Sequence, residues 1–290
     1  MDIRLKMPGG AVKDLQPRSK SFKWWRVIVI IALVLLYIGP IYILLTGSLR
    51  GITDLSSKLY LPKVWMWSNY KDALSNATFF TGLKNSATIA VVSALGSVFL
   101  SSMAAFGLLR SGYRFSEWIG SINLGIMMVP GTALLVGVYV MMTRIQGVNH
   151  LWAIEILNIA GAMPSGTFLF MAFMRSIPSS LDEAATIDGA GVFRTYWRII
   201  MPQLTPVVIL NIIQTGVGSW NNYLMPVFIL QSPDKITIIQ VIKNAFNSSF
   251  GIENVAAASA LTALGILPIV LIYLFLQRFI VAGQIDAANK

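Results

Sequence analysis

A polar stretch between two apolar runs, residues 178–202, holds the side chains whose types and spacing suggest a built site. Ser180 and Glu183 stand in the S-x-x-E spacing of a capping box, in which each side chain accepts a hydrogen bond from the other residue's backbone amide. Asp182 falls in the same first turn, where the helix dipole favours a negative charge. Gly189 is expected to end this helix with a positive φ. This chemistry is recognition rather than bond making, so we interpret the stretch as a docking segment.

The second half of the stretch predicts another short helix. Gly191 separates it from the first helix, and Val192 to Met201 follow, with Arg194 and Arg198 four residues apart on one face. Two short helices joined by a glycine turn would lie at an angle to each other at the membrane surface. This arrangement is typical of a segment that fits into a partner protein.

Amides and aromatic rings follow a helical spacing in a later apolar run, residues 204–230. The polar positions at steps of three and four are Asn211, Gln214, Gly218, Asn221 and Asn222, and the neighbouring aromatic residues are Trp220 and Tyr223. Such spacing places the polar side chains on one helix face. They could bond to neighbouring helices, at about 0.6–2 kcal/mol per contact. They could also line a path suited to hydroxyl groups and sugar rings, and the residues alone leave both interpretations open.

Several function classes are excluded by residues that the sequence lacks. It has no cysteine and one histidine, His150, and it contains neither H-E-x-x-H nor a pair of acidic residues inside an apolar run. We therefore expect no metal site, no catalytic residue and no cofactor in this chain. The phosphate-binding pattern G-x-x-x-x-G-K-[S/T] is also missing, so the chain is not expected to hydrolyse ATP. The net charge of +10 is spread over loops and termini, which argues against nucleic-acid binding.

The composition predicts an all-α integral membrane protein with six transmembrane helices. The chain is 56% hydrophobic and 12% charged, with a mean hydropathy of +0.69. Six apolar runs reach the roughly 20 residues that cross a bilayer, and Glu155 is the one charged residue inside them. The runs lie near 27–46, 86–109, 118–142, 152–174, 204–230 and 255–277. In the fourth, Pro164 within Gly161–Gly166 is expected to kink or unwind the helix.

The predicted organisation is one membrane domain, residues 27–282, between a basic tail, 1–26, and a short tail, 283–290. With the N-terminus inside, 14 of the 22 lysines and arginines fall on the cytoplasmic side. Both termini and the segment 176–202 would then be cytoplasmic. The basic tail would lie near anionic lipid headgroups.

The docking segment resembles the coupling loop of the permease subunits of bacterial ABC importers. That loop reads Glu-Ala-Ala, three residues, Gly, nine residues, Ile-x-Leu-Pro, and a methionine replaces its leucine here. The matching residues are Glu183, Ala184, Ala185, Gly189, Ile199, Met201 and Pro202. The run from Trp220 to Pro226 resembles the sugar-importer branch, in particular the smaller subunit of maltose-type permeases.

The resemblance implies a type I importer permease fold in a bacterial inner membrane. Its implied partners are a homologous second permease, an external solute-binding protein, and two ATP-binding subunits that hold ATP and Mg²⁺. The residues implied to contact the ATP-binding subunits are Glu183, Ala184, Ala185, Gly189, Ile199 and Pro202. The resemblance of the run Trp220–Pro226 favours the path interpretation of the polar stripe. The path residues on that hypothesis are Asn211, Gln214, Trp220, Asn221, Asn222 and Tyr223. The implied cargo is a sugar or oligosaccharide.

Other functions are weighed against this one. No lysine or arginine lies inside the apolar runs, so the chain offers no counter-ion to an anionic solute, and a neutral solute is the simplest cargo. An importer of an acidic glycan or a polyamine would have the same architecture. A stand-alone secondary transporter is less favoured, because we find no paired repeats and no acidic relay within the membrane. An intramembrane enzyme is disfavoured by the missing catalytic groups.

Overall fold

The computed structural model describes residues 24–54, 56–112, 114–247 and 255–288. Most of the predicted basic tail, residues 1–23, and the last two residues of the C-terminal tail lie outside the described residues. The chain divides into two compact units, Met1–Ile43 and Leu44–Lys290, and each is described by itself.

Four described helices are each long and apolar enough to cross a membrane, and the count reaches six if two bent pairs are each one span. The long helices are α1 (Trp24–Ser48), α3 (Phe79–Arg110), α6 (Leu151–Met174) and α13 (Val255–Ala288). The first unit contains α1 up to Ile43, and the second begins with the last turn of that helix. With each bent pair taken as one span, the six predicted spans have counterparts, although the second pair already begins at Val192. Helix α13 continues past residue 282, where we placed the domain boundary.

The third predicted span is bent by 89° between two helical parts. These parts are α4 (Arg114–Met127) on one side and η1 (Gly131–Leu134) with α5 (Leu135–Arg144) on the other. Pro130 lies at the bend with an extended backbone, φ −63° and ψ 124°. Its ring removes the amide hydrogen that a continuous helix would use, so the helix stops there.

The fifth predicted span differs from the expected single run over 204–230. Helix α10 (Thr205–Trp220) follows the docking segment at an angle of 79° and ends at Trp220, and α11 (Leu224–Ile229) begins after a short break. Asparagine side chains compete for backbone hydrogen bonds and favour turns, so two of them in succession help to end the helix. Asn221 and Asn222 therefore lie beyond the helix on which we placed them.

The fourth predicted span stays one continuous helix, α6, so the expected unwinding at Pro164 is wrong. The carbonyl oxygen of Pro164 accepts a hydrogen bond of 2.9 Å from Asn123 Nδ2. A side chain on Gly166 would lie 2.5 Å from Ser101 Oγ on α3. The small residue in this segment therefore allows α6 and α3 to approach closely and does not interrupt the helix.

Shorter helices fill the connections. They are α2 (Ser68–Ser75), α7 (Ser180–Ile187), α8 (Val192–Thr195), the π-helical η2 (Tyr196–Ile200), α9 (Met201–Gln203), η3 (Pro233–Lys235) and α12 (Ile238–Asn247). Helix α12 starts with half of a T-x-x-Q capping box, because Gln240 Oε1 accepts hydrogen bonds from the backbone amide and the hydroxyl of Thr237, at 2.8 and 3.0 Å.

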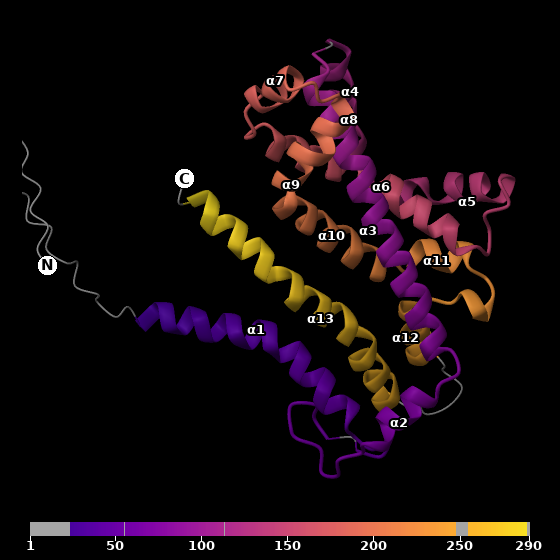
Figure 1. The fold of residues 1–290 in the computed structure, drawn as a ribbon. Helices are drawn as coiled ribbons and strands as arrows, with labels where there is room; N and C mark the ends of the chain where they lie inside the picture. Colours follow the sequence, from indigo (N-terminus) through magenta and orange to yellow (C-terminus); the bar gives the residue numbers. More distant parts are fainter. Residues whose placement is uncertain (1–23, 55, 113, 248–254, 289–290) are drawn as a thin grey trace, which may run out of the picture. The chain divides into compact units, whose positions relative to one another are not determined.

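Helix α3 is central to the second unit. It contacts α6, α10 and α12, and Figure 1 shows it running from the end where α7 and α8 lie to the end where α2 and α12 lie. Small polar residues on its inner side let the neighbouring helices come close. The buried serines are Ser86, Ser93, Ser97, Ser101 and Ser102.

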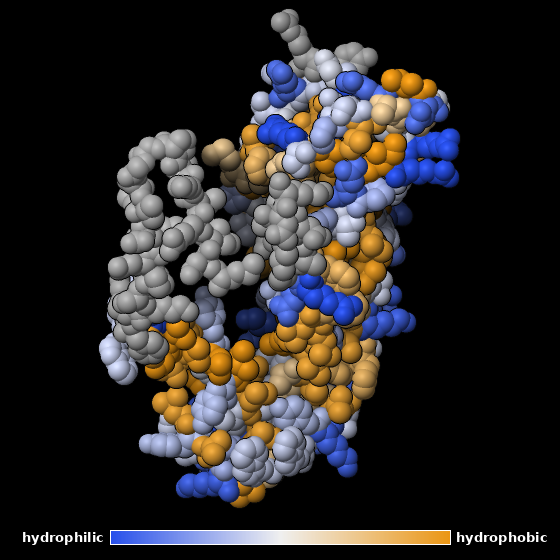
Figure 2. Space-filling view, turned by 60° about the vertical axis from the view of Figure 1, so that its left-hand side comes forward, coloured by the Kyte–Doolittle hydropathy of each residue, from blue (hydrophilic) through white to orange (hydrophobic). Residues whose placement is uncertain are grey.

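The surface carries many large apolar side chains. Exposed leucine, isoleucine, valine and phenylalanine residues recur along α3, α4 and α13, and Figure 2 shows broad hydrophobic patches on the side of the molecule. A protein surrounded by water rarely exposes so much apolar surface. The protein is an integral membrane protein whose spanning helices satisfy their backbone groups internally.

Candidate functional site

The docking segment begins with α7, but without the predicted capping box. Ser179 already has a helical backbone, φ −66° and ψ −19°, and its carbonyl oxygen accepts from the amides of Asp182 and Glu183 at 2.9 and 3.1 Å. An N-cap side chain needs an extended backbone to reach the free amides. Ser180 lies one residue inside the helix, so its hydroxyl forms no cap.

The end of α7 agrees with the sequence prediction. Gly189 has φ +76°, and its amide donates to the carbonyl oxygen of Thr186 at 3.0 Å. The amide of Ala190 donates to the carbonyl oxygen of Ala185 at 2.8 Å. Together these two bonds form a Schellman motif, which turns the chain sharply and satisfies the last carbonyl groups of the helix.

The second short helix is present but not uniform. Helix α8 passes into the wider π-helical turn η2 and then into α9, so the predicted stretch Val192–Met201 is helical throughout with a π turn at its centre. Arg194 and Arg198 are exposed, while Tyr196 and Ile200 are buried. The wide turn thus presents basic groups outward and anchors the segment inward.

The residues of the Glu-Ala-Ala pattern divide between surface and interior. Glu183, Ala184, Gly189 and Pro202 are exposed, whereas Ala185 is buried and Ile199 packs partly buried against the core.

Three apolar side chains that the sequence analysis did not single out are the most exposed on the segment. Ile187 is 86% exposed, Val192 73% and Phe193 66%, and they flank the Gly189 turn. We call these three residues the apolar tip. The signal available in the sequence was the presence of large apolar residues inside an otherwise polar loop.

Arg110, the last residue of α3, holds α7 from the membrane side. Its Nε lies 2.9 Å from Asp182 Oδ2, and its Nη2 donates to the carbonyl oxygen of Ile177 at 3.0 Å. The side chains of Arg110 and Asp182 are 21% and 22% exposed, so the pair is partly shielded from solvent and salt. No sequence pattern indicated this pair, because its two residues are far apart along the chain.

Tyr196 holds the second half of the segment to the same helix. Its hydroxyl lies 2.6 Å from Ser102 Oγ, and its ring centroid lies 5.2 Å from that of Phe106. Burial raises the pKa of the Tyr196 phenol, against an opposing effect of the bond to Ser102. The phenol therefore stays neutral at physiological pH. Sequence reasoning also missed this contact.

The predicted amide stripe is not one uniform face. Asn211 is 1% exposed, and its Oδ1 accepts a hydrogen bond of 3.1 Å from Ser97 Oγ on α3. Trp220 is buried against residues of α12 and α13. Asn222 Nδ2 donates to Asn158 Oδ1 on α6 at 2.9 Å. These three side chains pack between helices.

The remaining members of the stripe are more accessible. Gln214 and Asn221 are exposed, as is Gly218 between them. Tyr223 is half-buried, and Lys243 Nζ lies 5.8 Å from the centroid of its ring. The tertiary structure thus separates a bonding half of the stripe from a half that stays open for another role.

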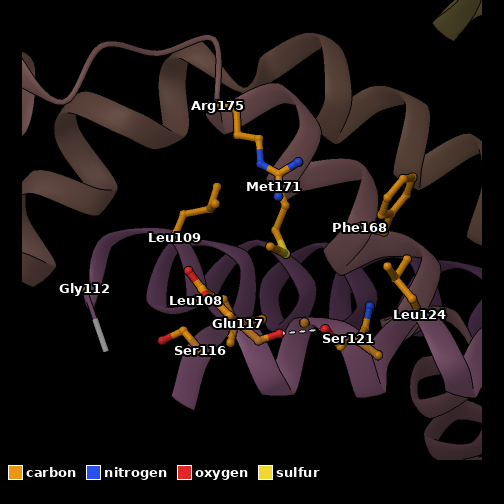
Figure 3. Close-up of a pocket in the computed structure, with 12 residues that line it drawn as sticks. Leu108, Leu109, Gly112, Ser116, Glu117, Ser121, Leu124, Phe168, Met171 and Arg175 are labelled. Carbon is orange, nitrogen blue, oxygen red and sulfur yellow. Dashed lines mark hydrogen bonds between the residues drawn. The ribbon is translucent and has the colours of Figure 1, made fainter. Parts of the chain in front are cut away.

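A cleft of about 490 Å³ lies beside the docking segment, between the ends of α3 and α6 and the start of α4. Figure 3 shows Arg175, the residue after α6, on one side of it and Glu117 and Ser121 of α4 on the other, with the Ser121 hydroxyl donating to the Glu117 carbonyl oxygen at 3.0 Å. Among the described residues, Arg175 and Glu117 form no ion pair. Arg175 is therefore a nearby cation that lacks an ion pair such as the one between Arg110 and Asp182.

The described residues thus form long apolar helices, with the short helices α7, α8 and α9 between α6 and α10. Residues 97–285 match the family model described as the binding-protein-dependent transport system inner membrane component. The chain belongs to this family.

Relatives and solved structures agree with that membership. The chain is 33% identical to the melibiose/raffinose/stachyose import permease protein MelC of Bacillus subtilis (strain 168), over 94% of this chain and 99% of the relative. It is also 33% identical to the probable starch degradation products transport system permease protein AmyC of Thermoanaerobacterium thermosulfurigenes, over 90% and 94%.

The fold resembles a chain in the crystal structure of a bacterial ABC transporter involved in the import of the acidic polysaccharide alginate. The TM-score is 0.79 at 19% identity, covering 89% of this chain and 95% of that one. At this identity the likeness shows the fold alone.

Proposed function

We propose that the chain is the transmembrane permease subunit of an ATP-driven importer and forms half of the translocation path for a sugar or oligosaccharide. The family is named for dependence on a binding protein, which supports delivery of the solute by an external solute-binding protein. The names of the two similar relatives concern oligosaccharides and starch products, which supports a sugar cargo. A homologous second permease and two ATP-binding subunits, which hold ATP and Mg²⁺, complete the proposed complex in a bacterial inner membrane.

The observation that carries the proposal is the apolar tip on a segment firmly attached to the membrane helices. Large apolar side chains exposed at a polar surface mark protein contact sites. Two of the three, Val192 and Phe193, are adjacent in the chain on α8, and Ile187 ends α7 before the Gly189 turn. We infer that the tip, with exposed Glu183 and Ala184, seats in a cleft of an ATP-binding subunit.

The solute path is proposed to run along the accessible part of the amide stripe. Gln214 and Asn221 offer amide donors and acceptors that can bond to sugar hydroxyls, and Tyr223 offers a ring face. The interhelical bonds of Asn211 and Asn222 hold these residues in position. An acidic glycan or polyamine importer would share the architecture and would differ in the solute bound by the external protein.

The test of docking uses the purified complex with its ATP-binding subunits. Changing Val192→Ser together with Phe193→Ser removes most of the exposed apolar contact, and central interface residues each contribute about 1–2 kcal/mol or more. We expect the ATP-binding subunits to be lost during purification, by at least tenfold relative to the unaltered chain. Arg198→Ser, an exposed polar change on the same segment, is the matched control. Full retention of the ATP-binding subunits by the double variant would contradict the docking role.

A further inference from the structure

One face of α3 contacts both halves of the docking segment. Ser102, Phe106 and Arg110 are spaced four residues apart, so they lie in a row along one side of the helix. Ser102 and Phe106 contact Tyr196, and Arg110 contacts α7. The row therefore joins α3 to the segment on both sides of the Gly189 turn.

The polar contact between α3 and α7 depends on the side chain of Arg110. Among the described residues, the ion pair between Arg110 and Asp182 is the polar contact that joins α7 to a membrane-spanning helix. The same guanidinium also bonds to the carbonyl oxygen of Ile177, in the connection from α6. A planar guanidinium has several N–H donors and a positive charge, so it can contact the carboxylate and the carbonyl oxygen at the same time. A neutral side-chain amide cannot form an ion pair with the carboxylate.

The other end of α3 holds a second non-spanning segment. Asn85 Nδ2 donates to the carbonyl oxygens of Asp234 and Ile236 at 3.0 and 2.9 Å, and Ser86 Oγ accepts from the amide of Ile238 at 2.9 Å. Helix α3 has 32 residues, which corresponds to roughly 48 Å at 1.5 Å per residue. One continuous helix thus connects the docking segment with the start of α12 (Figure 1).

We propose that Arg110 is a positioning residue that makes α7 and α3 move together, so that displacement of the docked segment is carried along α3 to the segment before α12. The residue touches neither ATP nor solute; it acts through α7. This inference rests on the proposed function, because it requires an ATP-binding subunit at the docking segment. Without the ion pair of Arg110, α7 would move with the ATP-binding subunit and would not displace α3.

The test separates attachment from transmission. We would prepare Arg110→Gln, Asp182→Asn and the double variant in the full complex, reconstituted with the external solute-binding protein. All three are expected to keep the ATP-binding subunits, and the solute transported per ATP hydrolysed should fall at least tenfold. Because each single change breaks the same pair, the double variant should be no worse than Arg110→Gln. The control is Arg175→Gln, which removes the same charge at a nearby residue outside the docking segment and should keep the normal ratio.

A second measurement follows the far end of α3 directly. The sequence has no cysteine, so Lys235→Cys can carry a single environment-sensitive fluorophore close to the Asn85 contacts. ATP should change its emission in the complex and fail to do so when Arg110→Gln is added. A normal transport ratio or a normal ATP-dependent signal in Arg110→Gln would overturn the proposal. Loss of the ATP-binding subunits from that variant would also overturn it, because Arg110 would then act in docking. Failure of the apolar-tip test alone would instead contradict the docking role of the segment, on which this inference depends.

Discussion

Gly189 illustrates a residue whose role is set by backbone conformation alone. Its φ of +76° falls in the left-handed region, yet a side chain there would meet no atom within 4 Å. The restriction is therefore conformational rather than steric, and it belongs to the Schellman motif that ends α7. The orientation of the apolar tip depends on this turn, because Ile187 precedes it and Val192 follows it.

Gly189→Val should destabilise the turn by about 1–2 kcal/mol, because a β-branched residue resists positive φ. We expect weaker retention of the ATP-binding subunits and slower transport, with normal membrane insertion. Gly189→Asn is the matched control, since asparagine tolerates this conformation. Purification of the assembled complex, followed by measurement of solute-stimulated ATP hydrolysis, checks both variants. Unaltered coupling in Gly189→Val would show that the turn does not position the docking surface.

Helix α10 shows that one row of amides can serve two purposes. Asn211 faces α3 and bonds to Ser97, whereas Gln214 lies less than one turn further along and is exposed. Successive residues of a helix are rotated by about 100°, so residues of one stripe can point in different directions. Some of them therefore face a neighbouring helix, and others remain exposed. The break after Trp220 then moves Asn221 off the helix while leaving it accessible.

The two halves of the stripe should respond differently to substitution. Asn211→Leu removes the acceptor of the Ser97 hydroxyl, which then keeps only the bond that Thr215 donates to it, and should reduce the yield of folded complex, with a cost of about 1–3 kcal/mol. Gln214→Leu and Asn221→Leu should leave the complex assembled and reduce solute transport at normal expression. Thermal unfolding of the purified complex and uptake by proteoliposomes provide the two measurements. If Gln214→Leu and Asn221→Leu both transport normally, the path lies elsewhere.

At the scale of the whole molecule, orientation decides which surface meets which partner. The proposed arrangement places both termini and the docking segment in the cytoplasm, while the connection between α1 and α3 faces outward. The distribution of lysines and arginines favours this arrangement, because basic residues are retained on the cytoplasmic side. The outward connection contains α2, and the described part of the connection between α10 and α13 contains α12.

Single cysteines can test this orientation because the natural sequence has none. Lys58→Cys, at an exposed position before α2, should react with a membrane-impermeant thiol reagent in intact spheroplasts. Asp188→Cys, at an exposed position at the end of α7, should react only after permeabilisation. Labelling in the reverse order would place the docking segment outside and would be incompatible with contact to ATP-binding subunits.

The sequence by itself determined the features that depend on neighbours along the chain. Apolar runs of sufficient length indicated the spans, and Gly189 indicated that a helix ends at a residue with positive φ. Both predictions were possible because run length and backbone freedom are local properties. The spacing of Glu183 to Pro202 indicated the docking segment through its family resemblance. The capping box at Ser180 was wrong although it was local, since the helix started one residue earlier than the pattern implied.

Only the tertiary structure decided which residues hold the segment and which remain free. Arg110 meets Asp182, and Ser102 meets Tyr196, because α3 and the docking segment pack together over separations of more than seventy residues. Pro164 lies inside a continuous helix, where Asn123 of α4 donates to its carbonyl oxygen, and the sequence pattern did not indicate that contact. Burial and long-range hydrogen bonds depend on how helices pack against one another, and a period along one helix cannot tell which of its faces a neighbour will cover.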